Sequence, residues 1–514
     1  MASRRSRRWA FCAGTGMALA ALAATATVST TARAATAGTA PPRVKLSASP
    51  LGVNVATWDY AYYASGSVNA IQPLLKAAGI RQLRYGGGSV ADAYDWQTNT
   101  DIENCLPSDP TASFTSSCAS SDALSFSQFS RQARAIGAQS FVTVNYGSGT
   151  PAEAAAWVKQ ATHTAGRAVA LWEVGNENYG CWEVNNELAG PPANYHGYLP
   201  KGGDNTTCPM ATKGVTAGMQ MVANSYAVNA KRFLTAMKAA NPKAVIGVPW
   251  AFGSEAPGSS VAGNTEWNNT VLKTDGKYVG FVDAHYYPFG FPGSTGGSNP
   301  TDQQVLRALF QIPALDWKIK NELHYYDRGA SVVVGETGVS YNETMTTCAP
   351  TGAVFAAGDV LSWLAVGAKS IDWWDMNNYG NTGSQCANPD DGLFTSSSKP
   401  VPETPYYGYL LASILAQPNA LFSTLSTTDS SDVLAYLSLL PDGKHAVALI
   451  NTNTGSAKRV KFHAPLTGTL QVWRYSAGNQ NAAKSKIVPW TTSAASVAGG
   501  MTLPAESITI LRTR

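Results

Sequence analysis

The chain has 514 residues, enough for a large catalytic domain and a smaller second module. Charged residues make up 14% and aromatic residues 10%, a composition that excludes an intrinsically disordered chain. Five of the 37 basic residues are arginines within the first 34 positions, and the rest of the chain carries one more acidic than basic residue. This near-neutral balance argues against nucleic acid or an anionic membrane surface as a partner.

Residues 1–34 predict an export signal peptide. Four arginines between positions 4 and 8 precede a weakly apolar stretch over 9–28, and an Ala-Arg-Ala cleavage site ends at Ala34. We therefore expect a secreted, extracellular protein, exported by either the twin-arginine or the general secretory route. A membrane anchor is disfavoured because glycine and threonine residues interrupt the apolar stretch.

Six cysteines follow the signal, and an even number of cysteines in an exported chain predicts disulfide bonds. The sequence leaves their connectivity open. We expect three local pairs, Cys105 with Cys118, Cys181 with Cys208, and Cys348 with Cys386. A zinc site is the alternative, but no C-x-x-C or H-x-x-x-H spacing supports it, and no metal is expected.

Eight short apolar runs alternate with longer helix-like segments between residues 50 and 418. The runs cover 51–56, 82–85, 141–145, 168–174, 244–248, 281–284, 332–336 and 370–374. Such alternation predicts a parallel sheet with crossover helices, and apolar spacing in 68–78 and 216–240 supports the helices. Eight units predict the α/β class and a (β/α)8 TIM barrel over residues 50–418.

The pattern changes after about residue 420. Strand-like segments at 433–440, 445–451, 460–463, 470–475 and 507–512 are separated by turn residues. They predict a C-terminal β-sandwich domain over 419–514, with residues 44–49 as an additional strand. The sandwich could bind carbohydrate, but a structural module packed on the barrel is the favoured interpretation.

Two carboxylates each lie at the carboxyl end of a predicted barrel strand. Glu177 follows the fourth strand and Glu336 ends the seventh. Because the carboxyl ends of barrel strands converge on one pocket, the two side chains should meet there. Glycoside hydrolysis needs two such groups, one to protonate the leaving oxygen and one to attack the anomeric carbon. The alternative, that each glutamate is a structural ion-pair partner, does not explain why both follow strands.

Other strand ends supply supporting groups. Arg84 ends the second strand, and beside Glu336 it would keep that carboxylate ionised. Gly87 would let the backbone approach a sugar, or would serve only a tight turn. After the sixth strand, Tyr287 could hydrogen-bond the nucleophile, and His285 could orient its neighbours or be a structural histidine.

Further substrate-binding candidates offer polar anchors or aromatic faces. Asn176 could bind the sugar 2-hydroxyl, a contact that strengthens in the transition state. Sugar rings have apolar faces that stack on aromatic side chains and hydroxyls that need fixed partners. The remaining candidates at strand ends are Trp58, Asp59, Asn145, Trp374 and Asn377. Strand alternation places only one of Trp373 and Trp374 in the barrel.

These motifs resemble clan A of the glycoside hydrolases. Gly175-Asn176-Glu177 is similar to the clan's acid/base motif, His285-x-Tyr287 to its strand-six motif, and Trp374 to its strand-eight tryptophan. The resemblance covers roughly residues 44–514. It implies a barrel enzyme with Glu177 as general acid/base, Glu336 as nucleophile, retention of anomeric configuration and no cofactor.

Two families within the clan fit different segments. Residues 84–87 and 172–180 resemble α-L-arabinofuranosidases, although Gly86 stands where those enzymes usually have proline. Residues 335–338 with Tyr341, and 355–358, resemble the β-glucuronidase and heparanase family. A uronate needs basic partners, and the strand ends offer little beyond Arg84, which favours a neutral sugar, arabinofuranose first.

The expected partner is therefore a plant or microbial polysaccharide or oligosaccharide, bound by a monomer. Another β-glycosidase or an endo-glycanase of the same clan is an alternative function. A non-catalytic carbohydrate-binding protein that kept the barrel is a second alternative.

Overall fold

The computed structural model describes most of the chain from residue 43 onward. The described ranges are 43–59, 67–101, 120–121, 124–164, 168–180, 182–183, 209–289, 300–326, 329–339, 349–377, 391–395, 399–476 and 487–514. The predicted signal peptide and all six cysteines of the predicted disulfides lie outside these ranges. Within them, no helix has the length and apolar character needed to span a lipid bilayer.

Eight parallel strands close into a barrel, which confirms the predicted (β/α)8 fold. In chain order they are β2 (Leu51–Val55), β3 (Gln82–Tyr85), β7 (Gln139–Val144), β8 (Val169–Val174), β9 (Ile246–Trp250), β10 (Phe281–Tyr286), β11 (Ser331–Thr337) and β12 (Ile371–Trp373). The fifth strand lies two residues later than the predicted 244–248. The other strands overlap their predicted positions, because runs buried on both faces must be apolar throughout.

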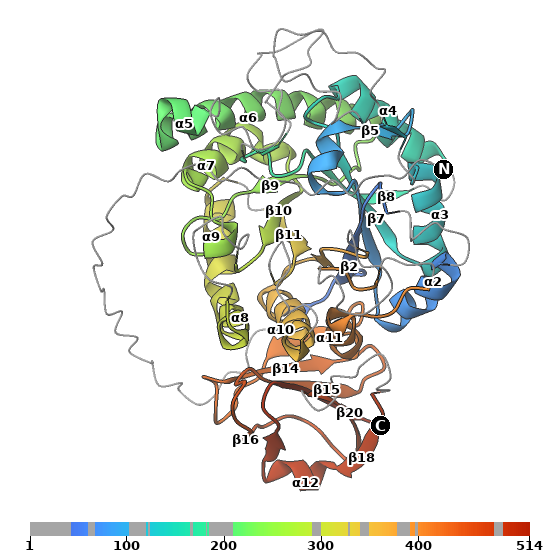
Figure 1. The fold of residues 1–514 in the computed structure, drawn as a ribbon, viewed down its shortest axis with the longest axis vertical. Coiled ribbons are helices and arrows are strands. Elements are labelled where there is room, and N and C mark those ends of the chain that lie inside the picture. The colour runs from blue at the N-terminus through green and yellow to red at the C-terminus, as the bar shows by residue number, and fades with distance from the viewer. Residues whose placement is uncertain are drawn as a thin grey trace, which may run out of the picture.

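A helix follows each barrel strand and covers the outside of the sheet (Figure 1). In chain order these are α2 (Ser67–Ala77), α3 (Phe126–Ile136), α4 (Pro151–His163), α6 (Val215–Ala240), α7 (Asn264–Asp275), α9 (Ile312–Tyr326), α10 (Pro350–Val366) and α11 (Thr404–Ala412). Capping residues in the sequence fix where these helices begin and end. Helix α3 begins with a capping box of Ser125 and Gln128 and ends at Gly137 in the left-handed conformation.

Shorter elements fill the connections. Strands β4 (Tyr94–Asp95), β5 (Thr100–Asp101) and β6 (Ser120–Ser121) form a small antiparallel sheet after β3. Helix α5 (Pro209–Lys213) precedes α6, and α8 (Asp302–Ala308) precedes α9. The long connections follow β3, β8, β10 and β12, at the end of the barrel where the strands terminate.

The C-terminal residues form a seven-stranded antiparallel sheet and a two-stranded one. The larger sheet has the order β1 (Val44–Lys45), β13 (Leu421–Thr424), β14 (Val433–Leu439), β15 (His445–Asn451), β20 (Ser507–Thr513), β17 (Thr469–Ser476) and β18 (Trp490–Ser493). The smaller sheet pairs β16 (Lys458–Val460) with β19 (Met501–Leu503), and α12 (Ala494–Ala498) lies between β18 and β19. These sheets confirm the predicted β-sandwich.

The two faces of the larger sheet belong to different cores. Val447 and Leu449 join Val460 and Leu503 of the smaller sheet in one buried cluster. The alternate residues of the same strands, such as Ile450 and Ile510, belong to the core that also contains the barrel helices. Figure 1 shows α10 and α11 lying between the barrel and the sheet.

The barrel interior changes from apolar to polar along its axis. One buried cluster consists of Phe141, Leu171, Phe281 and Val333, each from a different strand. Two residues further along three of these strands lie Thr143, Glu173 and Asp283, all buried. The strand period of two thus places a polar layer at the carboxyl end of the barrel.

Candidate active site

Two strand ends deliver the predicted carboxylates to the same end of the barrel. Strand β8 ends at Val174, and the chain turns through Gly175 at φ 76° to Glu177 at φ 44°. A positive φ is uncommon in residues other than glycine and typically marks a functional site. In β11, Gly335 is an extra residue relative to β10, and this bulge pairs Glu336 with His285. Bulges of this kind re-aim a side chain.

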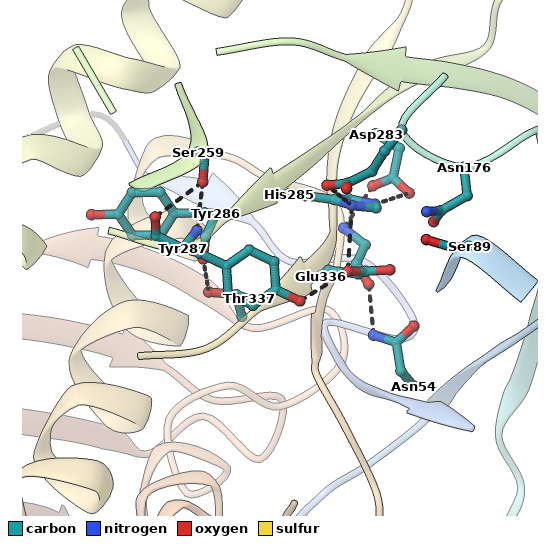
Figure 2. A network of polar contacts seen from close by, with 12 residues as sticks. Asn54, Ser89, Asn176, Ser259, Asp283, His285, Tyr286, Tyr287, Glu336 and Thr337 are labelled. Carbon is teal, nitrogen blue, oxygen red and sulfur yellow. Dashed lines mark hydrogen bonds and ion pairs between the residues drawn. The ribbon is translucent and has the colours of Figure 1, made fainter. Parts of the chain in front are cut away.

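The two carboxylates meet at His285. Glu177, His285 and Glu336 each present one side-chain atom within 4.8 Å of the others. The His285 Nδ1 lies 2.9 Å from Glu177 Oε1 and 3.4 Å from Glu336 Oε2. Figure 2 shows His285 reaching down to Glu336 from the adjacent strand. The structure therefore brings together two residues that lie 159 positions apart in the sequence.

Two donors fix the orientation of Glu336. Arg84 Nη1 donates a hydrogen bond of 2.7 Å to Oε1. The Tyr287 hydroxyl donates one of 2.8 Å to Oε2 (Figure 2). Glu336 is 5% exposed, so its carboxylate is almost fully enclosed. Each oxygen keeps a lone pair that the two donors leave unused, because a carboxylate has about four acceptor positions.

Arg84 connects polar side chains from several parts of the barrel. Its guanidinium donates hydrogen bonds to four side chains, Asn54 (2.9 Å), Glu336 (2.7 Å), Glu173 (2.9 Å) and Asn176 (2.9 Å). Burial alone would lower the pKa of Arg84, but the charges of Glu173, Glu336 and Asp283 raise it well above its ordinary value. The guanidinium therefore stays charged, and its rigid fork holds side chains from several strands in register.

Three donors surround the carboxylate of Glu177. The Tyr179 hydroxyl donates to Oε1 at 3.0 Å, the Trp182 indole N–H donates to Oε2 at 3.0 Å, and His285 Nδ1 lies 2.9 Å from Oε1. Burial would raise the pKa of Glu177, but the hydrogen bond and charge of His285 outweigh it and lower the pKa below its ordinary value.

The pKa of His285 moves in the opposite direction to that of Glu177. Burial would lower the pKa of His285, but Glu336, Asp283 and Glu177 together raise it well above its ordinary value. Without substrate, His285 thus holds the proton that it shares with Glu177 across their 2.9 Å contact.

Two further buried carboxylates support the loop after β8. Asp92 accepts hydrogen bonds from the backbone N–H groups of Tyr146, Gly147 and Asn176 and from the Asn178 side chain. Burial nonetheless raises the pKa of Asp92 to about 7. Glu183 accepts from the hydroxyl of Ser89 and the amide of Asn176. Asn176 is therefore fixed on one side by Glu183 and on the other by Arg84.

Several predicted substrate-binding residues lie beside this cluster. Gly87 has φ 82°, and a Cβ there would lie 2.5 Å from the Trp58 ring, so glycine permits the close approach of that tryptophan. A Cβ on neighbouring Gly88 would meet Trp374 at 2.9 Å and lie 3.7 Å from Glu336 Oε1. Trp374 thus lies next to Glu336, and Asp59 is buried directly after β2.

Two predicted substrate-binding residues serve their own loops instead. Asn145 accepts hydrogen bonds from the backbone of Ser148 and Gly149 and donates to the carbonyl of Tyr94. Asn377 donates to the carbonyls of Phe394 and Thr395. Their position at strand ends was a sound signal for the pocket, but short asparagine side chains readily cap adjacent turns.

Sequence reasoning missed Asn54, Glu173 and Asp283, whose side chains point into the barrel. Asn54 and Glu173 bind Arg84, and Asp283 accepts the backbone N–H of Gly335 at 2.6 Å. Strand alternation could have found them, because each lies two residues from another inward-facing position. Tyr179 and Trp182 were also missed, since both lie on an irregular loop without periodicity.

Among the described residues, two clusters have the geometry to hold a metal ion. They are Glu173 with Asp283 and His285, and Glu177 with His285 and Glu336. Arg84 lies 2.9 Å from Glu173 and 2.7 Å from Glu336, so its permanent positive charge competes with a cation at both clusters.

No family model and no curated protein matches this chain. Its structure is similar to an α-L-arabinofuranosidase from Thermotoga maritima at 15% identity, with a TM-score of 0.64, covering 92% of this chain and 98% of that one. It is also similar to a 4-O-α-L-rhamnosyl-β-D-glucuronidase from Fusarium oxysporum at 14% identity, with a TM-score of 0.58, covering 91% and 97%. A β-xylosidase from Caulobacter crescentus matches at 12% identity, with a TM-score of 0.55, covering 93% and 98%. At these identities the likeness shows the shared fold of barrel and sandwich.

Proposed function

We propose that this protein is a retaining glycoside hydrolase. The observation that carries the proposal is the meeting of Glu177 and Glu336 around His285, with atoms within 4.8 Å of one another. Retaining enzymes hold their two carboxyl groups about 5–5.5 Å apart, whereas inverting enzymes need about 6.5–9.5 Å to admit a water. The short separation favours direct attack by one carboxylate.

In the first step, Glu336 attacks the anomeric carbon while Glu177 donates a proton to the departing oxygen. Arg84 and Tyr287 hold the Glu336 carboxylate in one orientation, so that an oxygen lone pair is available for attack. The bond from the anomeric carbon to the leaving oxygen breaks as the glycosyl-enzyme ester forms. In the second step, ionised Glu177 removes a proton from water, which then hydrolyses the ester.

The acid for the first step belongs to the pair formed by Glu177 and His285. The raised pKa of His285 and the lowered pKa of Glu177 reflect one proton shared across 2.9 Å at Oε1, so Glu177 becomes an acid when its other oxygen, Oε2, takes up a proton from water. Forming the ester removes the negative charge of Glu336, which weakens the hold of His285 on its proton. The same pair thus serves the acid step and the base step.

A neutral sugar fits the described residues better than a uronate. Arg84 is buried, and its hydrogen bonds are committed to Asn54, Glu173, Asn176 and Glu336. Its two terminal nitrogens therefore have no spare donor for a substrate carboxylate, and its Nε, which makes no hydrogen bond among the described residues, lies 3.6 Å from Asp283 Oδ2. We favour an α-L-arabinofuranoside, as the 84–87 and 172–180 segments indicate; a β-glucuronide is the alternative, supported by the 335–338 segment.

A panel of aryl glycosides tests the activity and the sugar together. It contains the arabinofuranoside, xyloside, galactoside, galactofuranoside and glucuronide, beside plant polysaccharides. We expect turnover of the arabinofuranoside. Hydrolysis of the glucuronide alone would reverse the choice of sugar, and inactivity on every member would contradict the hydrolase.

Two substitutions test the residues. Glu336→Gln should abolish turnover while leaving the fold unchanged, because the amide is a poor nucleophile of nearly the same shape. Glu177→Ala should lose activity that added azide restores as a glycosyl azide, since azide attacks the glycosyl-enzyme in place of water and needs no base to remove a proton. Full activity of either variant would contradict the assignment.

A further inference from the structure

Trp182 lies at the mouth of the site in an unusual position for so large an apolar side chain. It is 41% exposed, although its indole N–H donates to the Glu177 carboxylate. Two successive turns return the chain to this point, with the N–H of Gly180 bonded to the carbonyl of Glu177 and that of Glu183 to Gly180. The loop that carries the acid/base candidate therefore folds the tryptophan back over it.

Gly180 makes room for the indole ring. A Cβ at this position would lie 2.2 Å from Cε2 and 2.4 Å from Cζ2 of Trp182, which no real contact permits. The ring thus rests directly on the backbone, with Tyr179 against it edge-on at 6.3 Å between ring centroids. Although its N–H lies at Glu177 and its Cε2 and Cζ2 atoms lie at Gly180, 41% of the Trp182 side chain stays exposed and is open to contact with another ring.

The hydrogen bonds of Glu177 show which oxygen can reach the leaving group. Among the residues that the structure describes, Oε1 has two partners, Tyr179 and His285, whereas Oε2 has the Trp182 N–H alone. A carboxylate oxygen has two acceptor positions, so Oε2 keeps one free. The oxygen that exchanges a proton with the leaving group is therefore the one that the indole touches, and the departing group must sit beside the exposed ring.

We propose that Trp182 forms the leaving-group subsite, stacking its free face on the ring of the departing sugar or aryl alcohol while its N–H holds Oε2 of Glu177. The proposal rests on the proposed hydrolase function and adds the specificity of its leaving-group side. It makes Trp182 a binding residue for ring-shaped leaving groups and a positioning residue for the acid/base.

Leaving groups with and without a ring separate these roles. Suitable substrates are 4-nitrophenyl α-L-arabinofuranoside and α-L-arabinofuranosyl fluoride, or the matching pair for whichever sugar the panel identifies. For Trp182→Ala we expect KM for the aryl glycoside to rise about tenfold, the size of one aromatic stacking contact. KM for the fluoride should change less than twofold, since fluoride has no ring to stack.

Trp182→Phe isolates the N–H. It keeps an aromatic face but removes the donor to Oε2, which favours the ionised form of Glu177. The basic limb of the pH profile of kcat should therefore move to higher pH, with KM for the aryl glycoside raised less than in Trp182→Ala. A merely structural role for the ring would leave the pH profile unchanged.

Gly180→Ala and Trp490→Ala complete the set. The first displaces the indole without altering it and should reproduce the rise in KM of Trp182→Ala. The second removes a tryptophan of nearly equal exposure, 42%, from the sandwich. It should change KM for neither substrate. It also guards against a general effect of losing a surface tryptophan.

The outcomes distinguish this proposal from the proposed function. If the wild type hydrolyses both substrates but Trp182→Ala and Gly180→Ala affect them equally, the leaving-group subsite is wrong and the hydrolase stands. If the wild type hydrolyses no glycoside, both proposals fall.

Discussion

Arg84 and Tyr287 show how single residues prepare the proposed nucleophile. One supplies a permanent charge and the other a hydroxyl, and each contacts a different oxygen of Glu336. Removing Arg84 and removing the Tyr287 hydroxyl leave different groups without a hydrogen-bond donor. Arg84 is shared with buried carboxylates in the barrel, whereas the Tyr287 hydroxyl serves Glu336, so their removal should have different consequences.

Tyr287→Phe should lower kcat about 10- to 100-fold with little change in stability. A hydrogen bond to a charged group contributes about 1.5–3 kcal/mol, and phenylalanine preserves the packing of the ring. Steady-state kinetics beside a thermal melt measure both effects. An unchanged kcat would show that the hydroxyl does not act on the reacting carboxylate.

Arg84→Lys should lower kcat at least about 100-fold and also destabilise the fold. Lysine is a point charge that cannot serve four acceptors, which leaves buried carboxylates without donors at a cost of about 3–5 kcal/mol. Arg512→Lys, at an exposed pair with Asp442, is the matched control and should alter neither kcat nor the melting temperature. Equal behaviour of the two variants would contradict the central role of Arg84.

At this scale the sequence predicted the residues that follow strands and missed those inside them. Glu177, Glu336, Arg84 and Tyr287 were found because a strand end points to the pocket. Glu173 was missed because it lies within an apolar run. The sequence of one strand does not show where the barrel interior changes from apolar to polar, since the neighbouring strands decide it. Asn145 was chosen on the same ground, its place at a strand end, and in the structure its side chain bonds within its own turn.

Behind the site, strand β11 forms a glycine bulge and contacts a buried carboxyl group of helix α10. Gly335 forms the bulge that aims Glu336, and a Cβ there would lie 2.1 Å from Asp283 Oδ2. Next along the strand, the Thr337 hydroxyl lies 3.0 Å from both the Tyr286 carbonyl and Asp359 of α10. One hydroxyl hydrogen cannot serve both acceptors at once, and the raised pKa of Asp359 favours a neutral carboxyl group that can donate to Thr337.

Asp359→Asn should make the stability of the protein less sensitive to pH. Burial raises the pKa of Asp359 to about 8, above its ordinary value of 3.8. The folded state therefore binds a proton that the unfolded state releases, and stability falls as pH rises from about 4 to about 8. Removing this group should flatten the decline by about 1.4 kcal/mol per pH unit within that window.

Denaturant titrations at several pH values measure this slope. Asparagine can donate to Thr337 as the neutral acid does, so the variant should fold. A slope equal to that of the wild type would mean that Asp359 is ionised in the folded protein.

At the scale of elements, the strands were predictable and the bulge was not. The apolar runs that mark β2 to β12 are long enough to identify, because both faces of a barrel strand are buried. The extra residue in β11 depends on its register against β10, which involves a segment about 50 residues earlier in the chain. Strands β13, β18 and β19 were missed because they are short and partly exposed.

The barrel and the sandwich share one core. Ile450, Ile508 and Ile510 of the sheet lie in the same buried cluster as Val354 and Leu361 of α10. The Ser362 hydroxyl also meets the Tyr436 hydroxyl at 2.6 Å across this interface. The sequence favoured a module packed on the barrel, but the contacting faces could not be assigned without the strand register.

Ile510→Ala should destabilise the barrel together with the sandwich. Truncating a buried isoleucine costs about 2–5 kcal/mol, and in a shared core the whole molecule bears that cost. We expect one cooperative melting transition at a lower temperature, with activity lost in the same transition. A separate early transition that leaves activity intact would show that the two parts unfold independently.

The central claim is that Glu336 forms a covalent bond to the sugar. A 2-deoxy-2-fluoro glycosyl fluoride of the sugar that the protein hydrolyses slows the second step more than it prevents the first, so the intermediate accumulates. Peptide mass spectrometry of the inactivated protein should place the added glycosyl mass on the peptide containing Glu336, and Glu336→Gln should remain unlabelled. Labelling of any other residue, or turnover with inversion and no labelled peptide, would contradict the account.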